Sequence, residues 1–353
     1  MREINAKTVQ STALVVVVLL GSLLPVNAIG SHLGHHVWLS IIIAVLPAPL
    51  MVWLYSRLSD SGQRRLKMLL AAVLLLLSSY YVLLMLSFWS AFEMRNTPVL
   101  VYVLTFACFT FFSARLGRRA IERTASIVVF VFVVAVIGDT LLLMPDYHPR
   151  RLLPLAGADW ADVLITAGYY AALIYGMLPL TLGLFSEAGQ GKSKALRRGM
   201  GLGIGYYIIC IGRNALLFGD TLQLEGYPTV RALRMMQWDA AVSRLELLGA
   251  LAVLTVLLVY VVLLCRQLTD WLAAALRRKA DDKLLAAVCA ALYGSSYLGY
   301  VLLANPDTDG VRNAVALLSL LGLLLACRIG IPAAGCRKVG RGKAGKGRWA
   351  QNK

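Results

Sequence analysis

Long apolar runs recur through this sequence from its first residues to about residue 329. A helix of about 20 apolar residues crosses a hydrocarbon core of ~30 Å. Lipid offers no partners for backbone polar groups, so a spanning segment must pair its own N–H and C=O groups. The runs therefore predict an all-α polytopic membrane protein with about ten transmembrane helices. We expect the spans at residues 12–29, 37–55, 66–92, 98–114, 120–144, 163–185, 199–219, 240–264, 284–303 and 311–329.

The placement of positive charge supports this map independently. With the N-terminus in the cytoplasm, 27 of the 35 Lys and Arg residues fall on the cytoplasmic side of the alternating loops. Seven fall outside, and Arg213 lies within a span. Membrane proteins concentrate Lys and Arg in cytoplasmic loops in this way. The pattern predicts that both termini are cytoplasmic.

The chain divides into two regions. Residues 1–330 are predicted to form one ten-helix transmembrane domain, and residues 331–353 a basic, Gly-rich cytoplasmic tail without fixed structure. The formal net charge of +17 is then a membrane-surface charge. Such tails lie near anionic lipid headgroups, so we expect membrane lipids, and no nucleic acid, as partners.

The first span carries helix-breaking residues near its outer end. Gly21, Ser22, Pro25 and Asn27 fall there, and Gly30 follows. Proline removes a backbone hydrogen bond, and freed backbone groups in a membrane must face protein or water. A simple proline kink explains this pattern. A discontinuous helix, whose free N–H groups bind a ligand carboxylate, explains it as well.

The sixth span is irregular too, with two glycines and three tyrosines before Pro179. It lies five spans after the first, as two inverted five-helix repeats require. We therefore predict a midplane ligand cavity between the two interruptions, although tyrosines in such a span also pack within a bundle. The predicted ligand-binding residues are Gly21, Ser22, Pro25, Asn27, Gly168, Tyr169, Tyr170, Tyr175 and Gly176.

Charged residues within the spans are few. Asp139 and Arg213 lie at similar depth, near the outer ends of the fifth and seventh spans. A charge at that depth needs a partner or water, so we predict that the two approach each other. The alternative is that each extends separately to the outer surface. Arg244 and Glu246 begin the eighth span, two residues apart, and so point to different faces.

Catalytic and metal-binding constellations do not emerge from the sequence. His32, His35 and His36 cluster in a loop, where an exposed cluster is the expected interpretation rather than a metal site. No Ser-His-Asp set, phosphate-binding loop or carboxylate pair can be placed at one membrane face. We expect no enzymatic activity, no metal and no cofactor.

Several short motifs resemble the spore germination permease family, the B subunits of nutrient germinant receptors, within the amino acid–polyamine–organocation transporter superfamily. Their order and spacing along a ten-helix chain carry the resemblance. The matching segments are Gly21, Leu24 and Pro25 with Trp38; Thr97-Pro98; GRRAIER at Gly117 to Arg123; Arg151 to Pro154; Tyr227-Pro228 with Arg231; and Arg244-Leu245-Glu246. Two departures are Val26, where the family often has Arg, and Tyr175-Gly176-Met177, where it often has an acidic residue.

The resemblance implies a LeuT-like bundle of two inverted five-helix repeats, interrupted at helices one and six. It implies a spore inner-membrane location and assembly with an A subunit and a lipoprotein C subunit. The B subunit would bind a small nutrient, such as an amino acid, and pass the event to its partners. A secondary transporter for an amino acid or similar solute uses the same fold, and the sequence leaves that alternative open.

Overall fold

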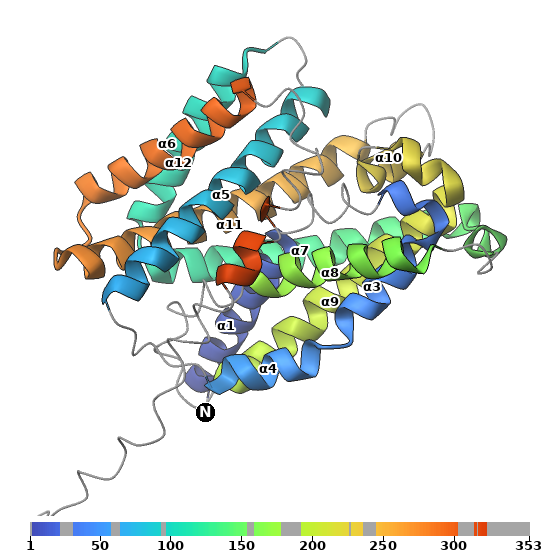
Figure 1. Ribbon diagram of the computed structural model, residues 1–353, viewed down its shortest axis with the longest axis horizontal. Coiled ribbons are helices and arrows are strands. Elements are labelled where there is room, and N and C mark those ends of the chain that lie inside the picture. Colours follow the sequence, from blue (N-terminus) through green and yellow to red (C-terminus); the bar gives the residue numbers. More distant parts are fainter. Residues whose placement is uncertain are drawn as a thin grey trace, which may run out of the picture.

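Helices make up the regular structure of the described chain, shown as a computed structural model in Figure 1. The structure describes residues 2–21, 31–57, 64–92, 97–153, 159–177, 192–225, 227–235, 245–302, 314–315 and 317–322. The α-helices are α1 (Arg2–Gly21), α3 (Val37–Val45), α4 (Ala48–Arg57), α5 (Arg64–Phe92), α6 (Val99–Arg115), α7 (Arg118–Leu142), α8 (Trp160–Gly176), α9 (Lys192–Phe218), α10 (Pro228–Met235), α11 (Leu245–Leu276) and α12 (Asp282–Leu302). Short 3-10 helices are η1 (Ser31–His36), η2 (Met144–Asp146), η3 (Pro149–Leu152) and η6 (Gly219–Leu224).

Length and apolarity make this an integral membrane protein. Within the described residues, six segments are long and apolar enough to cross a bilayer: Val37–Tyr55, Met68–Ser90, Arg118–Leu142, Ser193–Leu224, Gly249–Leu276 and Asp282–Leu302. Large apolar side chains also cover the outer faces of α6 and α7, where Phe112 is 61% and Phe130 70% exposed. Lipid solvates such surfaces, whereas a water-soluble monomer rarely exposes them over a wide area.

Each of the ten predicted spans overlaps residues that are helical in the structure. The span at 37–55 differs from the prediction because it is divided into α3 and α4 at Leu46-Pro47. Pro47 and Pro49 have no backbone N–H and cannot continue the helical hydrogen bonds. The eighth helix also differs, since α11 extends to Leu276 rather than ending at 264. Its added turns contain an intrahelical ion pair, Arg266 to Asp270 at 3.3 Å.

Two groups of helices pack against each other, as Figure 1 shows. In one group α5, α6, α11 and α12 contact one another, and in the other α3 contacts α8 and α9 while α1 contacts α9. Helix α7 packs on both α1 and α11, and α1 also packs on α11. The N-terminal helix is therefore surrounded, and Val15, Val17 and Leu19 have no exposed surface.

Glycines on α9 allow α1 to approach closely. A Cβ atom on Gly203 would lie 2.9 Å from Cβ of Leu19, and one on Gly199 would lie 3.0 Å from the carbonyl oxygen of Thr12. Both distances are shorter than van der Waals contact. Because lipid tails are as apolar as side chains, close backbone packing of small residues is a main source of helix association in membranes. Residues 199 and 203 therefore provide the α1–α9 contact surface.

Hydroxyl groups join the helices of the other group. The Ser79 hydroxyl on α5 lies 2.7 Å from that of Ser295 on α12, and the Ser296 hydroxyl lies 3.0 Å from the Ser79 carbonyl oxygen. Between α6 and α12, the hydroxyls of Thr110 and Tyr293 lie 2.7 Å apart. These bonds fix the rotation of α12 against its neighbours.

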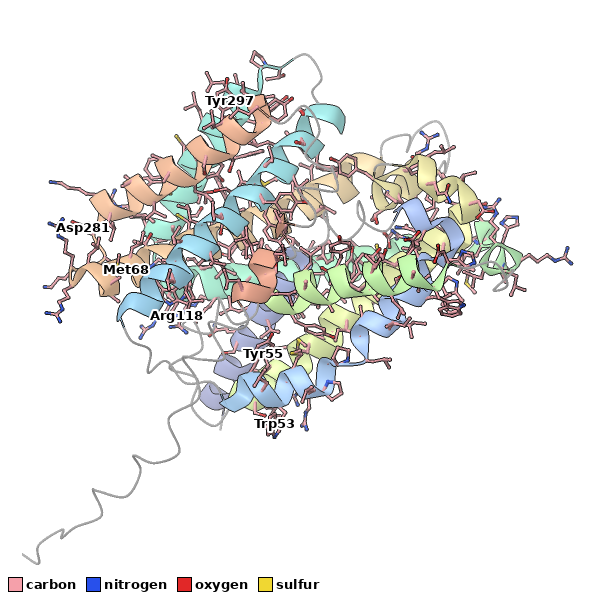
Figure 2. The ribbon with its side chains drawn as sticks, in the orientation of Figure 1. Trp53, Tyr55, Met68, Arg118, Asp281 and Tyr297 are labelled. Carbon is pink, nitrogen blue, oxygen red and sulfur yellow. The ribbon has the colours of Figure 1, made fainter. Side chains whose placement is uncertain are left out.

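The starts of several helices lie at the same end of the molecule. Figure 2 shows Met68 near the start of α5, Arg118 at the start of α7 and Asp281 just before α12 gathered at one end, with Tyr297 toward the far end of α12. An ion pair of 2.8 Å joins Arg115, at the end of α6, to Asp282. This arrangement is the one that the alternating loops require.

Candidate functional site

The end of α1 lies within a cluster of buried tyrosines. The described part of α1 ends at Gly21, and the rings of Tyr81 on α5 and Tyr260 on α11 pack edge to face with their centroids 5.5 Å apart. Tyr207 on α9 donates its hydroxyl to the carbonyl oxygen of Leu19, in the last turn of α1. We call Tyr81, Tyr207 and Tyr260 the tyrosine cluster.

Glycine at position 21 is required by Tyr260. A Cβ atom there would overlap the Tyr260 ring, with a separation of only 2.5 Å from its Cγ. The Tyr260 hydroxyl is fully buried and makes no hydrogen bond to any described residue. A buried hydroxyl without a partner is unfavourable by about 1–3 kcal/mol, and such groups in native proteins commonly serve a ligand or an ordered water.

Two further tyrosines, Tyr55 and Tyr175, form hydrogen bonds at the end of α8. The Tyr55 hydroxyl, on α4, donates to the Tyr175 carbonyl at 2.6 Å. The Tyr175 hydroxyl in turn reaches the carbonyls of Ala44 at 3.1 Å and Val45 at 3.4 Å. Val45 would normally receive the N–H of residue 49, which is proline. The two side chains therefore connect the α3–α4 break to the end of α8.

A cavity of about 680 Å³ lies along α8. The wall from α8 includes four of the predicted ligand-binding residues, and Pro47, Met51, Leu317 and Leu320 face them. Gly176 contacts the last described helical segment closely, since a Cβ atom there would lie 2.7 Å from Cβ of Ser319. The four predicted residues in the wall are Gly168, Tyr169, Tyr175 and Gly176.

The two intramembrane charges form an ion pair. Arg213 on α9 lies 2.5 Å from the Asp139 carboxylate on α7, and the side chains are 2% and 14% exposed. The contact expected from their similar depth is thus present. Around it, the Cys210 thiol lies 3.1 Å from the Thr229 hydroxyl, and the Asn214 amide donates to the same hydroxyl at 3.1 Å. The pair therefore joins α7 to α9 within a polar network that includes α10.

The remaining predicted residues do not line the cavity along α8 or lie outside the described part of the chain. Tyr170 is fully buried within the core and does not line the cavity along α8. Ser22, Pro25, Asn27 and Arg244 lie outside the described residues, as does the side chain of Glu246. The joint cavity between the two helix interruptions involves 22–30, so it stays a prediction.

Sequence reasoning missed the tyrosine cluster and Tyr55. Each of these residues lies in a span that is otherwise rich in Leu, Val and Ile. A lone tyrosine in such a span is a cue, because a phenolic hydroxyl in lipid needs a partner. The sequence could not show that three of them meet, since spans that are apolar on every side do not reveal which face points inward.

Comparisons with known proteins agree with this architecture. A family model described as "Spore germination protein" matches residues 5–299. A solved structure of a Na⁺-coupled sialic acid symporter, in a substrate-bound outward-open state, is similar with a TM-score of 0.55 and 9% sequence identity. The similarity covers 91% of this chain and 77% of the symporter chain, which shows a shared LeuT-like fold. No curated protein sequence matches the chain.

Proposed function

This chain belongs to the spore germination protein family, and from that membership we propose that it is the B subunit of a nutrient germinant receptor. The family is transporter-like rather than enzymatic. In our proposal a small nutrient, such as an amino acid, binds at the midplane. The bound state is then passed to an A subunit and a lipoprotein C subunit in the spore inner membrane.

The observation that supports the ligand site is the buried hydroxyl of Tyr260, whose ring contacts Gly21. Among the described residues this hydroxyl has no hydrogen-bond acceptor. A ligand carboxylate would accept that hydrogen bond, and free N–H groups at a helix interruption would add further donors. Among the predicted residues, Gly21, Ser22, Pro25 and Asn27 would form this side of the site.

The second side of the proposed site is the end of α8. Its interruption would correspond to that of the first helix if ten transmembrane helices form two inverted five-helix repeats. The Tyr55–Tyr175 connection supports a conformational role, because it links the end of α8 to a second break between α3 and α4. A ligand that moved the end of α8 would act on the α3–α4 break as well. We further propose that both termini are cytoplasmic and that the tail at 331–353 lies near lipid headgroups.

Binding can control a partner only through different affinities for two conformations. A coupling free energy of ~1–3 kcal/mol changes the partner's equilibrium by roughly 5–150-fold. We expect Tyr260→Phe to reduce nutrient-triggered germination by about tenfold, since it removes one hydrogen bond to a charged group. The matched control is Tyr297→Phe on α12, outside the tyrosine cluster.

The test measures germination and complex abundance together in spores. A normal nutrient response in Tyr260→Phe and in Gly21→Leu, with the protein at normal abundance, would refute the site. A loss of response in Tyr260→Phe at normal abundance, with Tyr297→Phe unaffected, supports it.

The alternative function is secondary transport of an amino acid or a similar solute. The LeuT-like fold, shared with a Na⁺-coupled symporter, favours this alternative. Purified protein in liposomes distinguishes the two. Solute uptake that depends on a Na⁺ or H⁺ gradient, and that is lost in Tyr260→Phe, identifies a transporter. Saturable binding without uptake identifies a receptor.

A further inference from the structure

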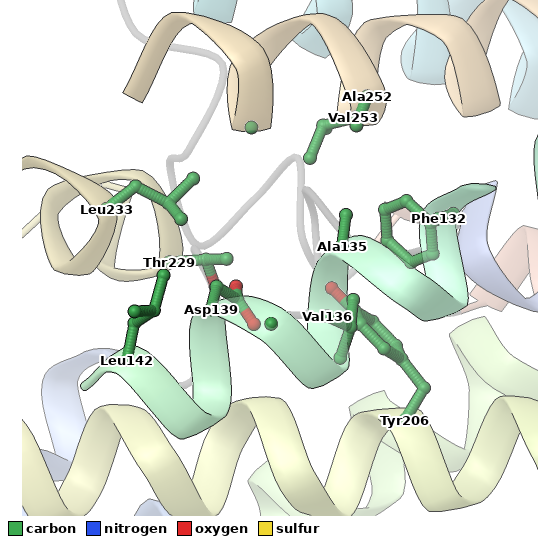
Figure 3. Close-up of a pocket in the computed structure, with 12 residues that line it drawn as sticks. Phe132, Ala135, Val136, Asp139, Leu142, Tyr206, Thr229, Leu233, Ala252 and Val253 are labelled. Carbon is green, nitrogen blue, oxygen red and sulfur yellow. The ribbon is translucent and has the colours of Figure 1, made fainter. Parts of the chain in front are cut away.

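A second cavity lies away from the tyrosine cluster, next to the intramembrane ion pair. It has a volume of about 200 Å³, is partly open, and is lined by residues of α7, α9, α10 and α11. Figure 3 shows Asp139 at its floor, with Thr229 and Leu233 on one side and Ala135 facing Val253 across the space. The cavity does not belong to the site proposed for the nutrient.

The lining of this cavity is apolar except at three side chains. Phe132, Leu142 and Val253 represent the apolar wall, and Asp139, Tyr206 and Thr229 supply the polar groups. The Thr229 hydroxyl already contacts Cys210 and Asn214, and the Tyr206 hydroxyl points to the Cys210 sulfur at 3.7 Å. Asp139 is thus the polar group best placed to bind a ligand.

One oxygen of Asp139 lacks a strong hydrogen-bond donor. Arg213 donates to Oδ2 at 2.5 Å, whereas the Thr140 hydroxyl lies 3.3 Å from Oδ1 and the Thr140 backbone N–H also hydrogen-bonds to the carboxylate. That hydroxyl also lies 2.6 Å from the Val136 carbonyl. A hydroxyl has one proton, and the shorter contact takes it. Oδ1 is therefore a carboxylate oxygen that can accept a donor from the cavity.

Charge limits which donor can bind. The Asp139–Arg213 pair is already neutral as a unit, so a charged ligand would bring an uncompensated charge into the membrane interior. Such a charge is costly there. A neutral molecule with one O–H group can donate to Oδ1 while its apolar part contacts the wall.

We propose that this cavity is a binding site for small neutral alcohols or phenols that reach it from the lipid. An apolar cavity of ~150 Å³ holds a benzene ring, so the observed space suits a ring that carries a hydroxymethyl group. A ligand from the lipid would reach the cavity along the apolar surface of α7, where Ile137 is 55% and Leu141 63% exposed. Leu142, which lines the cavity, continues the same surface.

The test uses the full chain in lipid nanodiscs and a diazirine derivative of benzyl alcohol as photoreactive probe. Benzyl alcohol, toluene, benzylamine and benzoate compete with it, each at a concentration corrected for partition into the lipid. We expect labelling of α7, α10 or α11 by mass spectrometry. Benzyl alcohol should displace the probe at roughly tenfold lower concentration than toluene, since only the alcohol bonds to a charged acceptor. The two charged compounds should displace it least.

Two variants separate the hydrogen bond from the cavity. Asp139→Asn should weaken displacement by benzyl alcohol about tenfold and leave displacement by toluene unchanged. Because Asp139→Asn also breaks the ion pair, Ala135→Phe provides a second test that fills the cavity from α7 without touching the charges. Its matched control is Ala287→Phe, on the exposed side of α12. The probe should label this variant to the same extent as the native chain.

Two results would overturn the site. Saturable labelling of α7, α10 or α11 that persists in Ala135→Phe means that the probe binds elsewhere. Equal displacement by toluene and benzyl alcohol in the native chain means that Asp139 does not bind the ligand. Neither result bears on the nutrient site, because the readout is independent of germination.

Discussion

At the scale of single residues, the most unusual feature is a nearly buried ion pair inside a membrane protein. Desolvation of both charges costs several kcal/mol, and close contact must offset it. Arg213 gains further from the Cys210 sulfur, which lies 3.9 Å from its guanidinium group. Removal of one partner would leave the other charge uncompensated in a low-dielectric environment.

We therefore predict that Asp139→Asn and Arg213→Gln each lower the unfolding free energy by about 3–5 kcal/mol. The double substitution should cost clearly less than the sum, because it leaves no unpaired charge. Thermal unfolding in a mild detergent, followed by circular dichroism, measures all three. Additive effects would mean that the two residues do not interact.

The sequence was sufficient to predict this pair, because depth along a helix can be counted from its ends. It was insufficient for the tyrosine cluster, because contacts within a bundle also depend on the rotation of each helix. Gly21 is the last described residue of α1, so the predicted break there stays a prediction. Its contact with Tyr260 joins residues 239 positions apart and carries no local sequence pattern.

At the scale of helices, glycine spacing on α9 decides how closely α1 can approach. Gly199 and Gly203 face α1, whereas a Cβ atom on Gly201 or Gly205 would meet nothing within 4 Å. Glycines on this one helix therefore differ in whether another helix packs against them.

We predict that Gly203→Leu destabilises the protein by about 1–3 kcal/mol or more, because it forces α1 away. Gly201→Leu should be neutral or stabilising, since leucine forms helices better than glycine by up to ~1 kcal/mol. Melting temperature and monodispersity in detergent provide the comparison. Similar losses in the two variants would contradict the role of close packing.

The α3–α4 break gives a prediction of its own. Tyr175→Phe should cost about 1–3 kcal/mol, because the Ala44 and Val45 carbonyls lose their donor. Tyr297→Phe is the matched control. Limited proteolysis near residue 46 reports the local effect, and unchanged protection in Tyr175→Phe would show that the break is held by other contacts.

Hydropathy predicted where helices occur but not how they are divided. Hydropathy does not show that the apolar run at 37–55 is divided into two helices. Pro47 and Pro49 are the residues in the sequence that indicate a break there. Likewise, α11 continues past the predicted end because polar residues beyond the hydrocarbon do not stop a helix. Helix length is set by backbone hydrogen bonds, whereas the span estimate followed apolarity alone.

At the scale of the whole molecule, topology is the most testable expectation. Reporter enzymes fused after residue 147, between α7 and α8, should be active outside the cytoplasm. Those fused after residue 280, between α11 and α12, should be active inside, as the Lys and Arg distribution predicts. Activity on the same side at both points would refute the alternating ten-helix map.

The length of α11 has a consequence for the lipid around the protein. Its 32 residues extend about 48 Å at 1.5 Å per residue, well beyond a hydrocarbon core of ~30 Å. Such a helix cannot stand upright with all of its apolar surface immersed, so it inclines or projects. Helices α1, α5, α7 and α12 all rest on it. A thinner or thicker bilayer therefore changes the preferred tilt of α11. Because these four helices pack against α11, hydrophobic mismatch acts on the conformation of the whole protein.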